Sequence, residues 1–207
     1  SSLSQNQTLA AFGGATQSAT EAKWGGKSAY FNGGASRLEA SGAGLAFGTG
    51  DFVVEFWMYY TGTASQYNIF DTRVSGGNGF LLYKSSEEDR LRIFAGGPIL
   101  TSGSVSQDAW HHIAIARNSG TLRLYVDGSQ SGASYSSSED FTDEGFVLGR
   151  YTVAYIDDLR ITKGSSRLYT GATIPVPTAA FPDGPMSAPT SLAATAGNAQ
   201  VSLTWTA

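Results

Sequence analysis

Apolar and polar residues alternate most regularly between residues 110 and 128. Alternation with a period of two is typical of a half-buried β-strand, and it places Ile113 and Ile115 on one face of a first segment. A short polar break that contains Gly120 separates this segment from a second alternating one. The pattern predicts an antiparallel hairpin, around which the rest of the chain packs.

A second long strand is predicted over residues 52–60. Its alternation assigns one set of side chains to the core, namely Phe52, Val54, Phe56 and Met58. Glu55, Trp57 and Tyr59 then lie on the opposite face, where a curved sheet would present them to solvent or to a ligand.

The remaining pattern and the composition both favour an all-β chain. Further strands are expected over residues 9–12, 37–40, 68–73, 80–84, 90–95, 146–150 and 154–162. The chain has 26 glycines, 12% aromatic residues and only 14% charged residues, which is typical of a β protein with many turns.

Composition and charge exclude several functions. No cysteine is present, so the chain has neither a disulfide framework nor a thiol nucleophile. The net charge is −4 and basic residues are scattered, which argues against binding of nucleic acid. No apolar run approaches the roughly 18 residues that a membrane helix needs, so membrane insertion is not expected.

Three segments resemble the laminin G-like jelly rolls of the concanavalin A-like lectin/glucanase superfamily. They are Gly50–Trp57, Trp110–Gly128 and Ala154–Ile161, in the order and spacing of that family. The resemblance runs from about Leu9 to about Pro182 and implies one domain over residues 1–182, built as a two-sheet antiparallel β-sandwich (jelly roll). It is unspecific for function, because this fold hosts lectins, glucanases, adhesion modules and inert spacers.

The C-terminal part carries two more resemblances. Residues 160–182 resemble the end of laminin G-like domains in phage virion proteins and marine bacterial surface proteins. Residues 183–187 are a predicted linker, and residues 188–207 resemble the first two strands of a fibronectin type III domain. Such a domain needs roughly 90 residues to close its core, so we expect the parent protein to continue.

Catalysis is not predicted. Glucanases of the superfamily place paired carboxylates close together on one strand, and no Glu-x-Asp-x-Glu triplet occurs here. Glu55 stands alone on its strand, and the neighbours Asp157 and Asp158 point to opposite faces of theirs. His111 and His112 also face opposite ways and cannot share a metal ion, so we interpret them as structural residues of the hairpin.

The resemblance also implies a calcium site. Jelly rolls of the superfamily hold calcium between a carboxylate of the last strand and an early turn, and the matching positions are Asp157, Asn32 and Gly33. Asn32 stands where Asp is usual, which weakens the site. A hydrogen bond from the backbone to Asp157 is an equal alternative, and the acidic residues within 140–144 are interpreted as solvated.

A sugar-binding platform is a further prediction. Sugar binding needs exposed aromatic rings and neighbouring groups that bind hydroxyls. The residues that fall on the predicted non-core faces are Trp57, Tyr59, Tyr83, Phe94, Arg92, Arg123 and Glu55. The alternative is that a loop or a neighbouring domain covers the rings.

Together these patterns predict a non-catalytic recognition or display module. We expect it in a phage fibre or decoration protein, where it would bind host-surface glycans or other surface proteins. The alternatives are a module of a secreted bacterial adhesin and a structural spacer without a ligand. The expected location is accordingly the virion surface or the bacterial cell surface.

Overall fold

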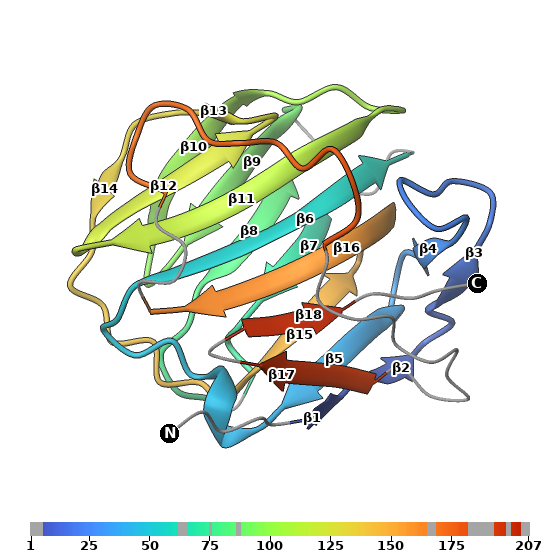
Figure 1. The fold of residues 1–207 in the computed structure, drawn as a ribbon, viewed down its shortest axis with the longest axis horizontal. Helices are drawn as coiled ribbons and strands as arrows, with labels where there is room; N and C mark the ends of the chain where they lie inside the picture. Colours follow the sequence, from blue (N-terminus) through green and yellow to red (C-terminus); the bar gives the residue numbers. More distant parts are fainter. Residues whose placement is uncertain are drawn as a thin grey trace.

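The computed structural model describes residues 6–61, 66–74, 76–85, 88–164, 169–181, 193–197 and 200–203. Two antiparallel sheets stack face to face (Figure 1), which confirms the predicted all-β jelly-roll sandwich. A short 3₁₀ helix, Ala43–Leu45, is the only helix in these ranges, and no helix there is long and apolar enough to cross a membrane.

Sheet A is the larger layer. Its spatial order is β1 (Asn6–Thr8), β17 (Ala193–Gly197), β18 (Gln200–Leu203), β16 (Val153–Lys163), β6 (Phe52–Tyr60), β11 (Trp110–Asn118), β12 (Thr121–Val126) and β13 (Ser129–Gln130). Three shorter strands extend it: β4 (Ser28–Asn32) pairs with β16, β3 (Thr16–Ser18) with β4, and β14 (Tyr135–Ser136) with β12.

Sheet B forms the second layer. Its order is β10 (Pro98–Ser104), β9 (Arg90–Phe94), β8 (Leu81–Ser85), β7 (Gln66–Asp71), β15 (Gly145–Arg150), β5 (Arg37–Ser41) and β2 (Ala10–Phe12). The core lies between the two sheets. The side chains assigned to it on β6 are confirmed, since Phe52, Val54, Phe56 and Met58 are each at most 1% exposed.

The predicted hairpin is formed by β11 and β12. Asn118 pairs with Thr121, and the two residues between them, Ser119 and Gly120, have φ values of 46° and 73°. Two consecutive positive φ angles are the mark of the tight turn whose twist matches that of paired strands. β11 also pairs with β6 from Trp110 to Arg117, so the hairpin is anchored in the middle of sheet A.

The last described strands, β17 and β18, form a second hairpin. β18 pairs with β16, and β17 pairs with β1. The predicted linker, residues 183–187, lies outside the described residues. Two paired strands occur in many β folds, so the fibronectin-like segment over residues 188–207 stays a prediction.

A buried arginine ties loops to this central hairpin. Arg117, at the end of β11, is 1% exposed, and its guanidinium lies near two phenylalanine rings of the core. It donates hydrogen bonds to the carbonyl oxygens of Gly50 at 2.8 Å, Gly48 at 2.5 Å and Glu139 at 2.7 Å. One side chain therefore satisfies three backbone acceptors in two loops.

We expect Arg117→Met to lower the free energy of unfolding by about 3 kcal/mol, because it leaves the carbonyl oxygens of Gly50 and Glu139 without their donor and removes one of the two donors to the Gly48 carbonyl. Arg117→Lys should recover part of the loss through its remaining ammonium group. Urea unfolding followed by tryptophan fluorescence measures both variants. A loss below about 1 kcal/mol for Arg117→Met would contradict the assigned role.

Candidate functional site

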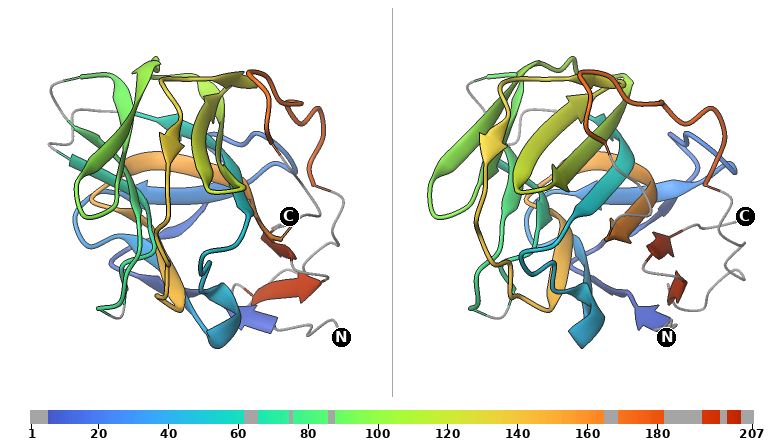
Figure 2. Two further views of the ribbon diagram at one scale, coloured as in Figure 1. Left: turned by 90° about the vertical axis from the view of Figure 1, so that its left-hand side faces the viewer. Right: turned by 60° about the vertical axis from the view of Figure 1, so that its left-hand side comes forward.

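Two segments cover much of the outer face of sheet A. The first is residues 169–181, called the strap, which crosses in front of β11 and β12 in Figure 1 and lies on the outside of the molecule in Figure 2. Tyr169 and Ile174 of the strap pack on a small apolar cluster of the sheet that includes Tyr125. The Ile174 N–H also donates to the Gly128 carbonyl at 2.8 Å.

Beneath the strap lies a buried network of charges. Glu55 is fully buried, and its Oε1 accepts hydrogen bonds from Arg160 Nη2 at 2.7 Å and Nε at 3.0 Å. Its Oε2 accepts a hydrogen bond from the Tyr169 hydroxyl at 3.0 Å and lies 3.3 Å from His112 Nε2. Burial raises the pKa of Glu55, but His112 and Arg160 outweigh it and hold the pKa below its ordinary value.

The end of the strap is fixed by a second buried carboxylate. The Phe181 N–H lies 3.1 Å from both oxygens of Asp158, and the Phe181 ring covers the Arg160 guanidinium at 3.5 Å. Asp158 has a φ of 54° and lies where the pairing of β16 with β6 is irregular, so it shares the outer face with Asp157. Burial raises the pKa of Asp158 to about 7.

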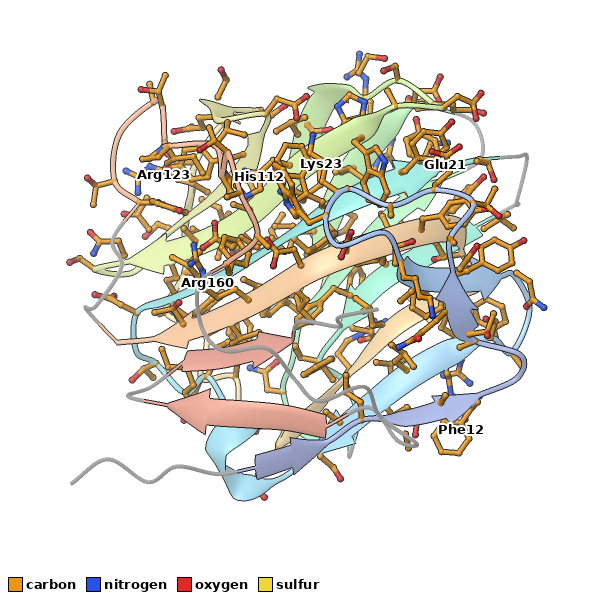
Figure 3. The ribbon with its side chains drawn as sticks, turned by 45° about the vertical axis from the view of Figure 1, so that its right-hand side comes forward. Phe12, Glu21, Lys23, His112, Arg123 and Arg160 are labelled. Carbon is orange, nitrogen blue, oxygen red and sulfur yellow. The ribbon has the colours of Figure 1, made fainter. Side chains whose placement is uncertain are left out.

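The loop between β3 and β4, residues 19–27, is the second cover. The Trp24 ring meets the Trp57 ring edge-on at 6.2 Å, and Lys23 Nζ lies 3.8 Å from the centre of the Trp57 ring. Figure 3 shows Lys23 on this loop. Trp57 is consequently 4% exposed, so the expectation that it would offer an open stacking surface is wrong, and the alternative of a covering loop holds at this residue.

The residues predicted to hold calcium are not brought together. Asp157 Oδ2 accepts hydrogen bonds from the backbone N–H groups of Lys23 at 2.9 Å and Trp24 at 3.0 Å. Asn32, which precedes Gly33, pairs with a residue four positions before Asp157 on β16, roughly 13 Å along the strand. No cluster of three acidic or histidine side chains suited to a metal occurs among the described residues, and calcium binding stays a prediction.

An aromatic row remains partly exposed at one end of the outer face of sheet A. Tyr30, Tyr155, Tyr59 and Trp110 occupy directly opposite positions on β4, β16, β6 and β11. Neighbouring ring centres are 4.8, 6.0 and 5.7 Å apart along the row, and all four side chains are half-buried. Three strand spacings make the row roughly 14 Å long.

Two carboxylates lie close to the middle of the row. Burial raises the pKa of the Tyr59 hydroxyl, and the negative charges of Glu21 and Asp108 raise it further. Glu21 belongs to the covering loop (Figure 3), and Asp108 to the turn before β11. The row thus combines aromatic faces with carboxylate oxygens that can accept hydrogen bonds from hydroxyl groups.

The other predicted platform residues lie elsewhere. Tyr83 and Arg92 are paired on β8 and β9 of sheet B, so the whole sandwich separates them from Tyr59. Phe94 is also on β9. Arg123, on β12, pairs with Ala116, which in turn pairs with Val53 near the start of β6, so Arg123 lies at the end of the sheet opposite to Tyr59. The single platform expected from the alternation is therefore wrong, because it joined residues from the outer faces of two different sheets.

Sequence reasoning missed three members of the row, although a signal for each was present. Tyr30 precedes the buried Phe31, and Tyr155 lies between two buried apolar residues, so alternation puts both on the outer face. Trp110 opens the signature hairpin. What the alternation could not supply is the register that sets these residues opposite Tyr59.

The raised pKa of Asp158 predicts that stability depends on pH. Its ordinary pKa is 3.8, so the folded state holds the proton more tightly than the unfolded state, and stability falls as the pH rises from about 4 through about 7. Asp158→Asn keeps an acceptor for Phe181, tolerates the positive φ, and should raise the free energy of unfolding at pH 8 by roughly 2–4 kcal/mol. At pH 4 it should be nearly neutral. Urea unfolding at both values measures this, and an equal effect at both would contradict it.

Comparisons with known proteins bear on the fold. Solved structures of similar fold include the carbohydrate-binding module CBM66 from Bacillus subtilis, with 15% identity over 73% of this chain and 93% of that chain and a TM-score of 0.52. The binding domain of botulinum neurotoxin serotype D matches with 12% identity over 78% of this chain and 44% of that chain, with a TM-score of 0.58. Domains LG4-5 of the mouse laminin α1 chain match with 12% identity over 71% and 41%, with a TM-score of 0.52.

The similarity covers only part of some of these chains. This chain spans less than half of the neurotoxin and laminin chains. No curated protein matches it in sequence. A laminin G-type family model, described as the concanavalin A-like lectin/glucanases superfamily, matches residues 32–166, which is more than half of the chain. The chain belongs to the concanavalin A-like lectin/glucanases superfamily.

Proposed function

We propose that this chain is a recognition module that binds a glycan through the aromatic row. The observation that carries the proposal is the direct pairing of four half-buried rings on neighbouring strands. Aromatic rings offer apolar faces of the size of a sugar ring, and nearby carboxylates can fix its hydroxyls. Because the row spans three strand spacings, it suits a ligand of more than one sugar unit.

Similar structures support a glycan as the ligand. One of them is a carbohydrate-binding module. Cell entry of botulinum neurotoxin type C depends on interaction with two ganglioside molecules, and a solved chain of that toxin has a TM-score of 0.56 with this chain. The glycosidase alternative lacks support, because Glu55, the one acidic residue of β6, is enclosed by Arg160, His112 and the strap.

The setting that we propose is the surface of a phage virion, in a fibre or decoration protein that engages host-surface glycans. Residues 160–182 resemble the end of laminin G-like domains in phage virion proteins, which supports this setting, and equally those in marine bacterial surface proteins. A module of a secreted bacterial adhesin would use the same row for the same chemistry. The genes beside the parent gene distinguish the two settings, since capsid and tail genes would indicate a phage.

We expect Tyr59→Ala and Trp110→Ala each to weaken glycan binding about tenfold, which corresponds to about 1.4 kcal/mol of lost stacking. A glycan array identifies a ligand, and titration calorimetry then measures its affinity. Both side chains are partly exposed, so the variants should keep the cooperative unfolding of the parent.

Two exposed aromatic residues outside the row serve as controls. Phe12 on β2 and Tyr151 after β15 are 40% and 44% exposed, and Figure 3 shows Phe12 well away from the covering loop. Phe12→Ala and Tyr151→Ala should leave affinity unchanged. Equal losses in the row and control variants would refute the assigned site, and no binding to any glycan at millimolar concentration would favour the structural spacer.

A further inference from the structure

A serine, a histidine and an aspartate meet at the rim of the sandwich, beside the Trp110 end of the row. Ser106 Oγ lies 3.0 Å from His111 Nε2, and His111 Nδ1 lies 2.6 Å from Asp127 Oδ2. This is the order of contacts in which a histidine takes a proton from a serine while a carboxylate orients the ring. From the sequence alone His111 is a structural residue of the hairpin, because it and His112 face opposite ways and cannot share a metal ion. Its contacts with Ser106 and Asp127 appear only in the structure.

Asp127 selects the tautomer of His111 that a general base needs. The Asp127 carboxylate accepts a hydrogen bond from the N–H at Nδ1 of His111, so the single proton of the neutral ring sits on Nδ1. Nε2 is then unprotonated and can take the proton of the Ser106 hydroxyl. Asp127 is itself held in place, since its Oδ1 accepts the His112 N–H at 2.8 Å and its own N–H donates to the His112 carbonyl at 2.8 Å. The hairpin that marks the family therefore also fixes the carboxylate.

Backbone hydrogen bonds before and after Ser106 hold the turn that carries it. The Val105 N–H donates to the Asp89 carbonyl at 2.6 Å, and the Asp108 N–H donates to the Tyr60 carbonyl at 3.1 Å. Ser106 itself is exposed, so a substrate can reach its hydroxyl. Between the pinned residues, the Gln107 N–H makes no hydrogen bond to another described residue. The N–H of the residue after a nucleophilic serine is a common donor to the oxyanion of acyl transfer.

We propose that Ser106, His111 and Asp127 form an esterase site that removes acyl groups from ester-bearing saccharides. Ser106 Oγ bonds to the acyl carbon while its proton passes to His111 Nε2, and the ester C–O bond breaks as the leaving alcohol takes that proton. A water molecule then gives a proton to the same nitrogen as its oxygen bonds to the acyl carbon. The bond between the acyl carbon and Ser106 Oγ breaks, Oγ takes the proton back from His111, and the carboxylic acid leaves. Asp127 is a positioning residue, because it acts through His111.

The saccharide part of this inference rests on the proposed function, whereas the ester chemistry does not. Trp110 of the row immediately precedes His111, and Asp108, which lies near Tyr59, is two residues from Ser106. His111 lies opposite the core residue Met58 and Trp110 opposite Tyr59, so the catalytic residues and the row share one end of β11 but face opposite sides of the sheet. We infer that the acyl group of a longer glycan reaches Ser106 around this end of the strand. The neutral ring is required, since a protonated His111 would instead donate from Nε2 to the Ser106 carbonyl, 3.1 Å away.

Hydrolysis of p-nitrophenyl acetate at pH 8.5 tests the nucleophile without any sugar. We expect Ser106→Ala to lower the rate at least about 100-fold, because it removes the nucleophile and with it the proton transfer to His111, a transfer that contributes about 100-fold or more. Ser104→Ala is the matched control, because Ser104 is exposed on the same segment and has no histidine partner among the described residues. Equal rates for Ser106→Ala and the parent chain would overturn the proposal.

Two further measurements separate catalysis from a structural role. A fluorophosphonate probe should bind covalently to Ser106 and not to Ser104, and mass spectrometry of the peptides identifies the labelled residue. The absence of a label on Ser106 would contradict a reactive serine. Asp127→Asn should lower the apparent pKa of the pH–rate profile, because the Asp127 hydrogen bond raises the pKa of His111 above its ordinary value despite partial burial. An unchanged profile overturns the positioning role.

Glycan binding is measured on the same variants. Binding of a glycan by the parent chain without any esterase activity overturns the esterase and leaves the proposed function standing, whereas esterase activity without glycan binding does the reverse. An O-acetylated ligand should lose its acetyl group with the parent chain and keep it with Ser106→Ala. Release of acetate by both proteins at equal rates would overturn the saccharide esterase.

Discussion

The buried ion pair between Glu55 and Arg160 governs the outer face of sheet A. Two charges on the outside of a sandwich would ordinarily face water, and removing them from water is unfavourable unless both are paired and hydrogen-bonded. The strap completes that set, because the Tyr169 hydroxyl donates to Glu55 and the Phe181 ring covers Arg160. The strap and the ion pair therefore depend on each other, and together they close the middle of this face.

Because the middle of the outer face of sheet A is covered, the proposed ligand-binding surface lies at one end of that face. The strap covers the centre, and the loop that carries Trp24 covers Trp57, so the strand residues whose rings form a partly exposed row are those around Tyr59. The same end of β11 carries His111 at the rim of the sandwich. The aromatic row and the histidine therefore lie at the same end of β11, with Trp110 and His111 on opposite faces of the strand.

Much of the fold could be predicted from the alternation of apolar and polar residues, whereas the sugar-binding platform could be predicted only in part. Glu55, Trp57 and Tyr59 were placed on the outer face of β6, and the structure puts them there. Their exposure could not be derived, because the covering groups are far away along the chain: Tyr169 is 114 residues from Glu55. Tyr83 was grouped with Tyr59 because alternation names a face of a strand and not the sheet to which the strand belongs.

The sequence by itself determined the long central strands, the side of β6 that faces the core, and the hairpin of β11 and β12, but not the strands β3, β4, β10, β13 and β14. These are properties of neighbouring residues, because side chains alternate along any strand and turn residues act locally. Only the tertiary structure decided that Tyr30, Tyr155, Tyr59 and Trp110 form one row, and that Ser106 reaches His111. Register between distant strands and the packing of loops arise from the whole core at once, so no local pattern encodes them.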